Sequence, residues 1–179
     1  MSFLTSFLRI FSFGLYKEPK KKHDSYYEEQ KDRCWYWKKD HLLVFFESPD
    51  LLERVHVFAA VEVWGDTTKT FGLELVEHDD EETADIVIEM GDAVVKGGVT
   101  HRSPSKTDRR EIVWAKIVIA KHEKGKRLLA IALHEIGHAI GATHDGAYES
   151  DAMHPKAIVT ELSGADKETL KKIYEKKGA

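Results

Sequence analysis

The chain contains a single cysteine, Cys34, among its 179 residues. One thiol cannot form a disulfide within the chain, so the fold must be stabilised by its hydrophobic core and by any metal ion that it binds. Hydrophobic residues make up 42% of the chain and charged residues 32%, which suits one domain with a full core and a short extension. We expect an N-terminal amphipathic segment and polar linker over residues 1–40 and one domain over residues 41–179.

The sequence also lacks any apolar run near the roughly 20 residues that a transmembrane helix needs. Residues 3–15 are apolar but short, with Arg9 inside them and Lys20–Lys22 after them, which is the wrong charge order for a secretory signal. As a helix, residues 2–16 would be amphipathic. Three interpretations stay open for this segment: packing against its own domain or a neighbouring subunit, contact with a membrane surface helped by the three lysines, and an unusual export signal. The localisation is therefore left open.

An excess of positive charge is absent as well, because the formal net charge is -4. Lysine and arginine are mixed with acidic residues over most of the length, so nucleic-acid binding is not expected. One acidic run, His78–Glu82, lies between two apolar stretches. Such a run is usually a solvated loop, and binding of Ca2+ is the weaker alternative because no defined ligand loop is present.

What the chain does contain is a dense group of metal-ligand residues in the stretch HEIGHAIGATHD, residues 134–145. On a helix, His134 and His138 project from one face because they are four residues apart, so both imidazoles can reach one ion. Glu135 lies beside the first histidine, where it can take a proton from a metal-bound water without being a ligand itself. The pattern therefore predicts two metal ligands and a general base on one helix.

The same stretch offers a third ligand. Gly141 can end the helix in a left-handed conformation and turn the chain so that His144 arrives from outside it. Three neutral nitrogens leave one tetrahedral position open for water, as in catalytic zinc sites, whereas structural sites fill all four positions. The alternative is an ordinary amphipathic helix that happens to carry histidines, but the full spacing favours one catalytic Zn2+ ion per chain.

Hydrophobic periodicity predicts the elements around this motif. Strands are expected over residues 41–46, 71–76, 85–89 and 112–120, together with a cleft-bordering strand between Gly97 and Trp114. After Ser48, a helix with Pro49 at its first position should run to about Gly65. Its predicted core positions are Leu51, Leu52, Val55, Phe58, Ala59 and Val61, with Trp64 at its end.

Two further helices are expected in the second half of the chain. The helix that carries the histidines should start within residues 125–127, and a last helix should start at Ser163 and Asp166, which resemble a capping box. The inward-facing positions of that last helix are Leu170, Ile173 and Tyr174.

The zinc motif resembles that of the metzincins, whose HExxHxxGxxH pattern is followed by a Met-turn, here at Ser150–Pro155. The resemblance is strongest to the matrixins and covers residues 41–176, through Ala60 and Trp64, ADIVIEMGD at Ala84–Asp92 and LSGADKETLKKIY at Leu162–Tyr174. It implies an α+β fold of the α/β-type metzincin kind. Such a fold has a twisted mixed sheet of four to five strands with a backing helix, an active-site helix, a Met-turn and a C-terminal helix.

Residue by residue, this resemblance implies roles for the motif and for the Met-turn. Glu135 would act as general base and acid, and Met153 would form an apolar floor beneath the metal. His154 and Pro155 would help to form the pocket for the side chain after the cleaved bond. The implied zinc ligands are His134, His138 and His144.

Three positions depart from the matrixin pattern or match it incompletely. Asp145 stands where matrixins usually have Ser or Gly, and His154 stands where they usually have Tyr. His101 resembles a structural-zinc ligand of vertebrate matrixins, but its companion ligands are not recognisable, so a surface or cleft-edge position is preferred.

The function that these features imply is a zinc-dependent endopeptidase acting on proteins or peptides. A zinc hydrolase of a non-protein amide is one alternative, and a structural or adaptor protein that retains the domain for its shape is another. The intact Glu135 argues against the second. Cys34 follows Arg33 as in the segment by which matrixin propeptides place a thiolate on the zinc, but a buried thiol packed with Trp35 and Trp37 is the preferred interpretation.

Overall fold

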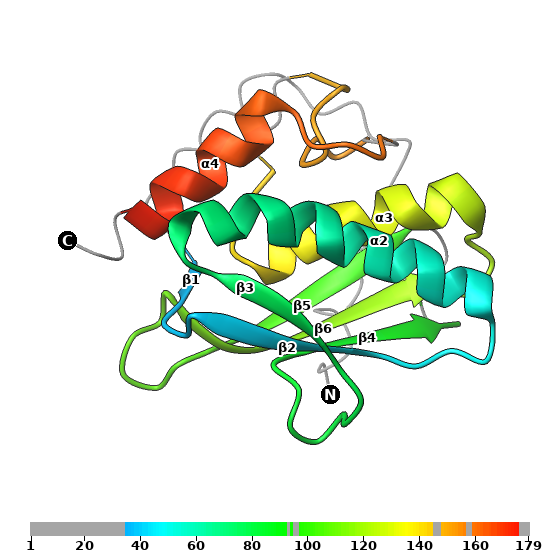
Figure 1. Ribbon diagram of the computed structural model, residues 1–179, viewed down its shortest axis with the longest axis horizontal. Coiled ribbons are helices and arrows are strands. Elements are labelled where there is room, and N and C mark those ends of the chain that lie inside the picture. Colours follow the sequence, from blue (N-terminus) through cyan, green and yellow to red (C-terminus); the bar gives the residue numbers. More distant parts are fainter. Residues whose placement is uncertain (1–34, 93, 95–96, 145–147, 157–158, 176–179) are drawn as a thin grey trace, which may run out of the picture. The chain divides into compact units, whose positions relative to one another are not determined.

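The computed structural model describes residues 35–92, 94, 97–144, 148–156 and 159–175, which belong to one unit spanning Cys34–Ala179. The predictions for residues 2–16 and for Cys34 fall outside the described residues. In Figure 1 two long helices lie over one face of a sheet. The elements in chain order are β1 (Tyr36–Trp37), β2 (His41–Phe46), α2 (Leu51–Thr68), η1 (Lys69–Phe71), β3 (Glu74–His78), β4 (Ile86–Gly91), β5 (Gly98–Pro104), β6 (Glu111–Ala120), α3 (Gly125–Ala139) and α4 (Gly164–Glu175).

The sheet is mixed, as predicted, and its strands follow the order β1-β6-β4-β2-β3, with β5 alongside β6. All pairings are parallel except that of β5 with β6, which is antiparallel. Parallel strands need crossover connections, and α2 supplies one of them between β2 and β3. The fold therefore combines α and β elements around a largely parallel sheet.

The predicted number of four to five strands is wrong, because the sheet has six among the described residues. The additional strand is β1, which lies in the stretch predicted to be a polar linker and pairs with the start of β6 at Glu111 and Ile112. Two residues are too few to show the alternation by which a strand is recognised. Trp37 is nevertheless fully buried, so this end of the linker belongs to the core.

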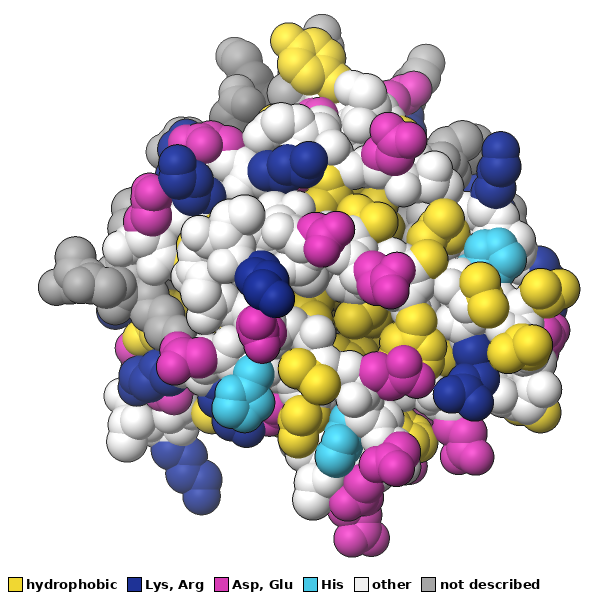
Figure 2. Space-filling model, viewed as in Figure 1, with side chains coloured by type: hydrophobic (Ala, Val, Ile, Leu, Met, Phe, Trp, Pro, Cys, Tyr) yellow, Lys and Arg dark blue, Asp and Glu magenta, His cyan; other side chains and the backbone are white. Residues whose placement is uncertain are grey.

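Helix α2 buries a different stripe from the one predicted. Leu51, Leu52 and Val55 are 70%, 67% and 55% exposed, and Figure 2 shows hydrophobic side chains at the surface over the start of this helix. The predicted core residues Phe58 and Ala59 are only partly buried. The residues that recur at helical spacing on the buried face are Glu53, Val57, Ala60, Val61, Trp64 and Thr68.

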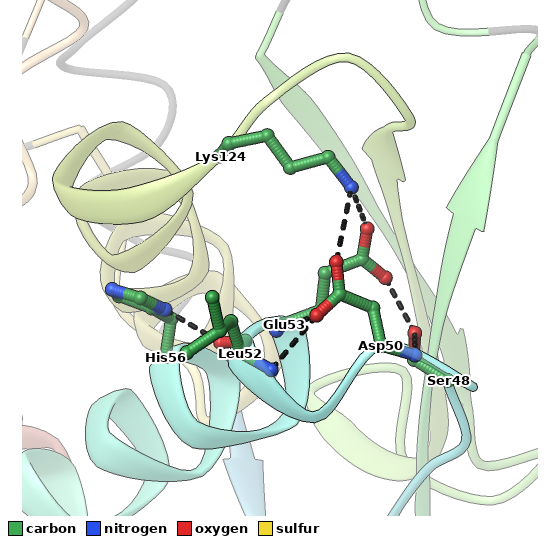
Figure 3. Close-up of polar contacts among 6 residues, drawn as sticks. All are labelled: Ser48, Asp50, Leu52, Glu53, His56 and Lys124. Atoms are coloured by element: carbon green, nitrogen blue, oxygen red, sulfur yellow. Dashed lines mark hydrogen bonds and ion pairs between the residues drawn. The ribbon is translucent and has the colours of Figure 1, made fainter.

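The charged Glu53 sits on that buried stripe because neighbouring side chains pair with it (Figure 3). Ser48 Oγ donates to Glu53 Oε2 at 2.5 Å, and Lys124 Nζ pairs with Glu53 Oε1. The helix begins at Leu51 rather than at the predicted Pro49, and Asp50 is its N-cap, since the Asp50 carboxylate accepts from Leu52 N at 2.8 Å. Lys124 immediately precedes α3, so this network ties together the starts of α2 and α3.

The strand predicted over residues 71–76 begins later than expected, because α2 extends further than predicted. The helix continues past Gly65 and closes with the 3-10 turn η1, and Gly72 then takes a φ of 82°. Strand β3 therefore begins at Glu74. Glycine tolerates such a left-handed conformation without the steric cost that a side chain would bring.

Helix α4 confirms the predicted capping box. Asp166 N donates to Ser163 Oγ at 3.2 Å, and Ser163 N donates to Asp166 Oδ2 at 2.9 Å. The predicted inward residues are buried, and the Tyr174 hydroxyl donates to Ile140 O at 2.9 Å. No helix within the described residues has the length and apolar character that crossing a bilayer would require.

Candidate metal centre

Helix α3 carries the candidate ligands and is buried along most of its length. Two indole N–H groups from other elements donate to its main chain: Trp64 Nε1 to Leu133 O at 2.7 Å, and Trp37 Nε1 to Ala139 O at 2.9 Å. Buried indole nitrogens need such acceptors, and a carbonyl in the last turn of a helix has no partner of its own. These contacts fix α3 relative to α2 and β1.

The structure brings the three predicted ligands together at one point. Nε2 of His134 lies 3.1 Å from Nε2 of His138 and 3.1 Å from Nε2 of His144, and the last two atoms are 3.0 Å apart. Tetrahedral zinc ligands at 2.0–2.1 Å from the ion lie about 3.3–3.4 Å from one another. The three nitrogens are therefore gathered much as the ligands of a single ion are.

Main-chain carbonyls fix the orientation of two of these rings. Nδ1 of His134 donates to Ala152 O at 2.6 Å, and Nδ1 of His138 donates to Ala142 O at 3.0 Å. When Nδ1 carries the hydrogen of a neutral ring, Nε2 presents a lone pair. Burial lowers the pKa of His134, lowers that of His138 well below 6.5 and lowers that of His144 to about 4, so the metal-binding neutral form is favoured.

This donor set fits a divalent metal ion. The Nε2 lone pairs of His134 and His138 face one another at 3.1 Å with no hydrogen to share, so they repel unless a cation lies between them. Three neutral imidazoles suit Zn2+ and leave one tetrahedral position open. Among the described residues, no other group of three His, Cys, Asp or Glu side chains converges in this way.

Gly141 makes the turn that carries the chain from α3 to His144. Its φ is 111°, so the predicted positive φ is confirmed, and its N–H donates to His138 O at 3.1 Å. A Cβ atom at this position would lie 2.2 Å from Trp35 O. Glycine is therefore required here both by the backbone conformation and by the approach of another chain segment.

Glu135, the predicted general base, is 4% exposed and points toward β5. Thr100 Oγ1 lies 2.6 Å from Glu135 Oε2 and 3.0 Å from Glu135 O. Burial raises the pKa of Glu135 to about 7, and the hydrogen bond from Thr100 opposes part of that rise. Sequence reasoning missed Thr100, whose only signal was its place in the predicted cleft-bordering strand.

The Met-turn packs against α3 between the two helical ligands. A Cβ atom at Gly137 would lie 2.4 Å from Met153 Sδ and 2.8 Å from Trp64 Cζ2, so the absence of a side chain there makes room for the methionine. Met153 itself is 1% exposed. This position is compatible with the predicted floor beneath a metal.

Asp166 supports that turn in a way that its capping role did not reveal. Its buried carboxylate accepts from Ala152 N at 2.8 Å and from Met153 N at 3.1 Å, besides the N–H of Ser163. Ala152 in turn accepts from His134 Nδ1. A continuous chain of hydrogen bonds therefore runs from α4 through the Met-turn to a candidate ligand.

His154 and Pro155, the predicted pocket residues, are both partly buried. Lys156 N donates to His154 Nδ1 at 3.2 Å, so a neutral His154 ring carries its hydrogen on Nε2. The pocket for a substrate side chain stays a prediction.

Arg102 is a second residue of β5 that the sequence did not single out. Its guanidinium lies over the Trp35 ring, 4.8 Å from the centroid, and Nη1 donates to His138 O at 3.4 Å. Burial lowers its pKa, and no carboxylate among the described residues forms an ion pair with it. A cation in this place complements the carbonyl end of α3.

Other predicted residues lie apart from the centre or outside the described part of the chain. His101 is exposed on β5, as expected for a surface or cleft-edge residue. In the acidic run, Asp80 accepts from Glu82 N and from the Thr83 hydroxyl, and Ca2+ binding there stays a prediction. Asp145 is not among the described residues.

No model of a known protein family matches this chain, and no curated protein is significantly similar to it. The resemblance to metzincins therefore rests on the motifs in the sequence.

Proposed function

We propose that this protein is a zinc-dependent endopeptidase of the metzincin type. The observation that carries the proposal is the convergence of three Nε2 atoms at 3.0–3.1 Å, with the buried Glu135 one residue after the first ligand. His134, His138 and His144 would hold the ion. When bound there, zinc supplies a Lewis acid that polarises a carbonyl and acidifies water.

In this proposal Glu135 moves the protons. Its carboxylate takes a proton from the attacking water and then delivers it to the nitrogen of the departing amine. A base works best when its pKa lies near the working pH, and burial raises the pKa of Glu135 to about 7. No side chain needs to form a covalent bond to the substrate, because water is the nucleophile.

The neighbouring strand favours a peptide over other amides. Strand β5 pairs with β6 alone among the described strands, so its other edge is left without a strand partner. It also packs beside α3, since Thr100 bonds to Glu135 and Arg102 to His138. An extended peptide could add to this edge by main-chain hydrogen bonds and bring its scissile carbonyl toward the histidines.

The test combines metal content with hydrolysis of an unfolded protein and of a peptide library. Wild type should bind one zinc ion per chain and cleave both substrates, and a chelator should abolish cleavage. Glu135→Gln should keep the zinc and lose at least about 100-fold in rate. Glu62→Gln, which alters an exposed residue of α2, should match wild type in both measurements.

Each alternative gives a different result. Hydrolysis of small amides without cleavage of any peptide would indicate a zinc hydrolase of another amide. Zinc binding without hydrolysis would indicate a structural or adaptor protein. Turnover by Glu135→Gln at the wild-type rate, or loss of its zinc, would refute the role given to Glu135.

A further inference from the structure

The inner face of β5 contacts the side chain of Glu135 at two positions, Gly98 and Thr100. A Cβ atom at Gly98 would lie 2.6 Å from Cγ of Glu135 and 3.0 Å from Cγ2 of Ile131, so glycine allows the strand to lie this close to α3. Two residues later, on the same face of the strand, the Thr100 hydroxyl lies 2.6 Å from Oε2 of Glu135. The strand therefore confines both the aliphatic part and one oxygen of this side chain.

The Thr100 hydroxyl can serve Glu135 with or without a proton. Toward the carboxylate it donates, and its distance of 2.6 Å from Oε2 is typical of an O–H···O⁻ bond. A hydroxyl can also accept. When Oε2 holds a proton, its O–H can donate a hydrogen bond to Thr100 Oγ1, while the hydrogen of the Thr100 hydroxyl turns to Glu135 O at 3.0 Å. The carboxyl group keeps a partner in both states.

Burial makes this partner hard to replace. Glu135 is 4% exposed, so bulk water has little access to its carboxyl group. A buried polar group that loses its hydrogen bond is destabilised and moves to find another partner. Glutamate has three side-chain torsions, so other orientations lie within reach. Removal of the Thr100 hydroxyl should therefore change where the carboxyl points.

We propose that Thr100 is a positioning residue: its hydroxyl holds Oε2 of Glu135, which leaves Oε1 to exchange protons with water and the departing amine. This inference rests on the proposed peptidase function. It assigns to β5 a part in catalysis beyond the pairing of a substrate chain.

The test uses two substitutions that separate the hydroxyl from the shape of the side chain. Thr100→Val keeps the shape and removes the hydroxyl, and Thr100→Ser keeps the hydroxyl. Thr68→Val is the matched control, because Thr68 is fully buried in α2 and its hydroxyl donates to Gly65 O at 3.3 Å. Each variant is assayed for kcat and KM on a fluorogenic peptide, for bound zinc and, by crystallography, for the orientation of Glu135.

Thr100→Val should lower kcat by about 10- to 100-fold with little change in KM, while zinc stays at one ion per chain. Thr100→Ser and Thr68→Val should stay within a few-fold of wild type. A wild-type kcat in Thr100→Val would overturn the proposal. So would a Ser variant as slow as the Val variant, because the loss would then not follow the hydroxyl.

The crystal structures give a readout that does not depend on turnover. In Thr100→Val the Glu135 carboxyl group should take a new orientation or more than one, whereas in Thr100→Ser it should match wild type. An unchanged orientation in the Val variant would overturn the positioning role. If the wild-type protein cleaves no peptide, the proposed function fails, and this comparison still decides whether Thr100 positions Glu135.

Discussion

Helices α2 and α3 cover the same face of the sheet, but they bury different kinds of side chain (Figure 1). The buried stripe of α2 is mostly apolar, and its charged member, Glu53, is paired at the start of the helix. In the middle of helix α3, His134 and Glu135 are buried, and each forms a hydrogen bond with a group from another part of the chain. A polar group thus anchors α2 at one end, whereas the two histidines of α3 converge with His144 at a single point.

This contrast teaches where a substitution should affect chemistry and where it should affect stability alone. The contacts that orient the polar groups of α3 come from β5, from the Met-turn and, through Asp166, from α4. Changes in these contacts should alter metal binding or turnover. Changes in α2 that spare the contact of Trp64 with α3 should alter the free energy of unfolding and leave the candidate metal centre intact.

The glycines that follow the two helices give the largest expected difference. Gly141→Ala would place a Cβ atom 2.2 Å from Trp35 O at a φ of 111°, so we expect a loss of about 3 kcal/mol or more in unfolding free energy. It should also lower the affinity for zinc, because His144 follows this turn.

Gly72→Ala is the matched control after α2. Its φ is 82°, but nothing lies within 4 Å of the added Cβ, so we expect a loss of about 1–2 kcal/mol and normal zinc binding. Denaturant unfolding and zinc content measure both variants. Equal losses of stability and equal zinc contents would remove the distinction between the two helices.

The pH dependence of the metal-free protein gives the next largest effect. Burial raises the pKa of Glu135 from its ordinary 4.5 to about 7, so the folded protein holds this proton more tightly than the unfolded chain does. The stability that this proton provides is full below pH 4.5 and is lost as the pH rises to about 7.

Glu135→Gln removes this titration. The stability of the variant relative to wild type should therefore rise between pH 4.5 and 7, by up to about 3 kcal/mol, and stay level outside that range. Chemical unfolding at a series of pH values, with zinc removed, measures it. A difference that does not change with pH would show that burial does not raise this pKa.

Two neighbours in the first turn of α2 give the smallest effects. Glu53→Ala removes the partner of Ser48 and Lys124, and we expect a loss of about 1–2 kcal/mol. Leu52→Ser changes a side chain that is 67% exposed, and we expect a change within about 0.5 kcal/mol. Both variants should bind zinc and turn over substrate as wild type does. A larger loss from Leu52→Ser than from Glu53→Ala would mean that the buried stripe of α2 is wrongly assigned.

The same contrast explains how much the sequence could reveal. In α3 the spacing of His134, His138 and His144 carries its own geometry, and the structure brings these three side chains together after a turn at Gly141, as predicted; their role as metal ligands stays a prediction. In α2, Leu51, Leu52 and Val55 have the apolar character and the spacing of core residues, but they are exposed, so the sequence pattern predicted the wrong buried face. The face that is buried includes Glu53, whose partner Lys124 lies 71 residues away in the sequence. No local sequence pattern predicts that pairing.

Contacts between distant elements account for the other omissions. Thr100 meets Glu135 across 35 residues, and Asp166 reaches the Met-turn across 13 and 14 residues. Local periodicity located the strand and the capping box that hold these residues, but it could not show that Thr100 contacts Glu135 or that Asp166 contacts the Met-turn. Strand β1 was missed because its two residues pair with a strand more than 70 residues later.

The most direct test of the account is X-ray absorption at the zinc edge of the loaded full-length protein, together with zinc content. We predict one zinc ion per chain with three imidazole nitrogens and one further light atom at about 2.0–2.1 Å. A sulfur atom at about 2.3 Å would instead place a thiolate in the fourth position, with Cys34 as its source. That result, a fourth imidazole or a failure to bind zinc would contradict an open three-histidine catalytic centre.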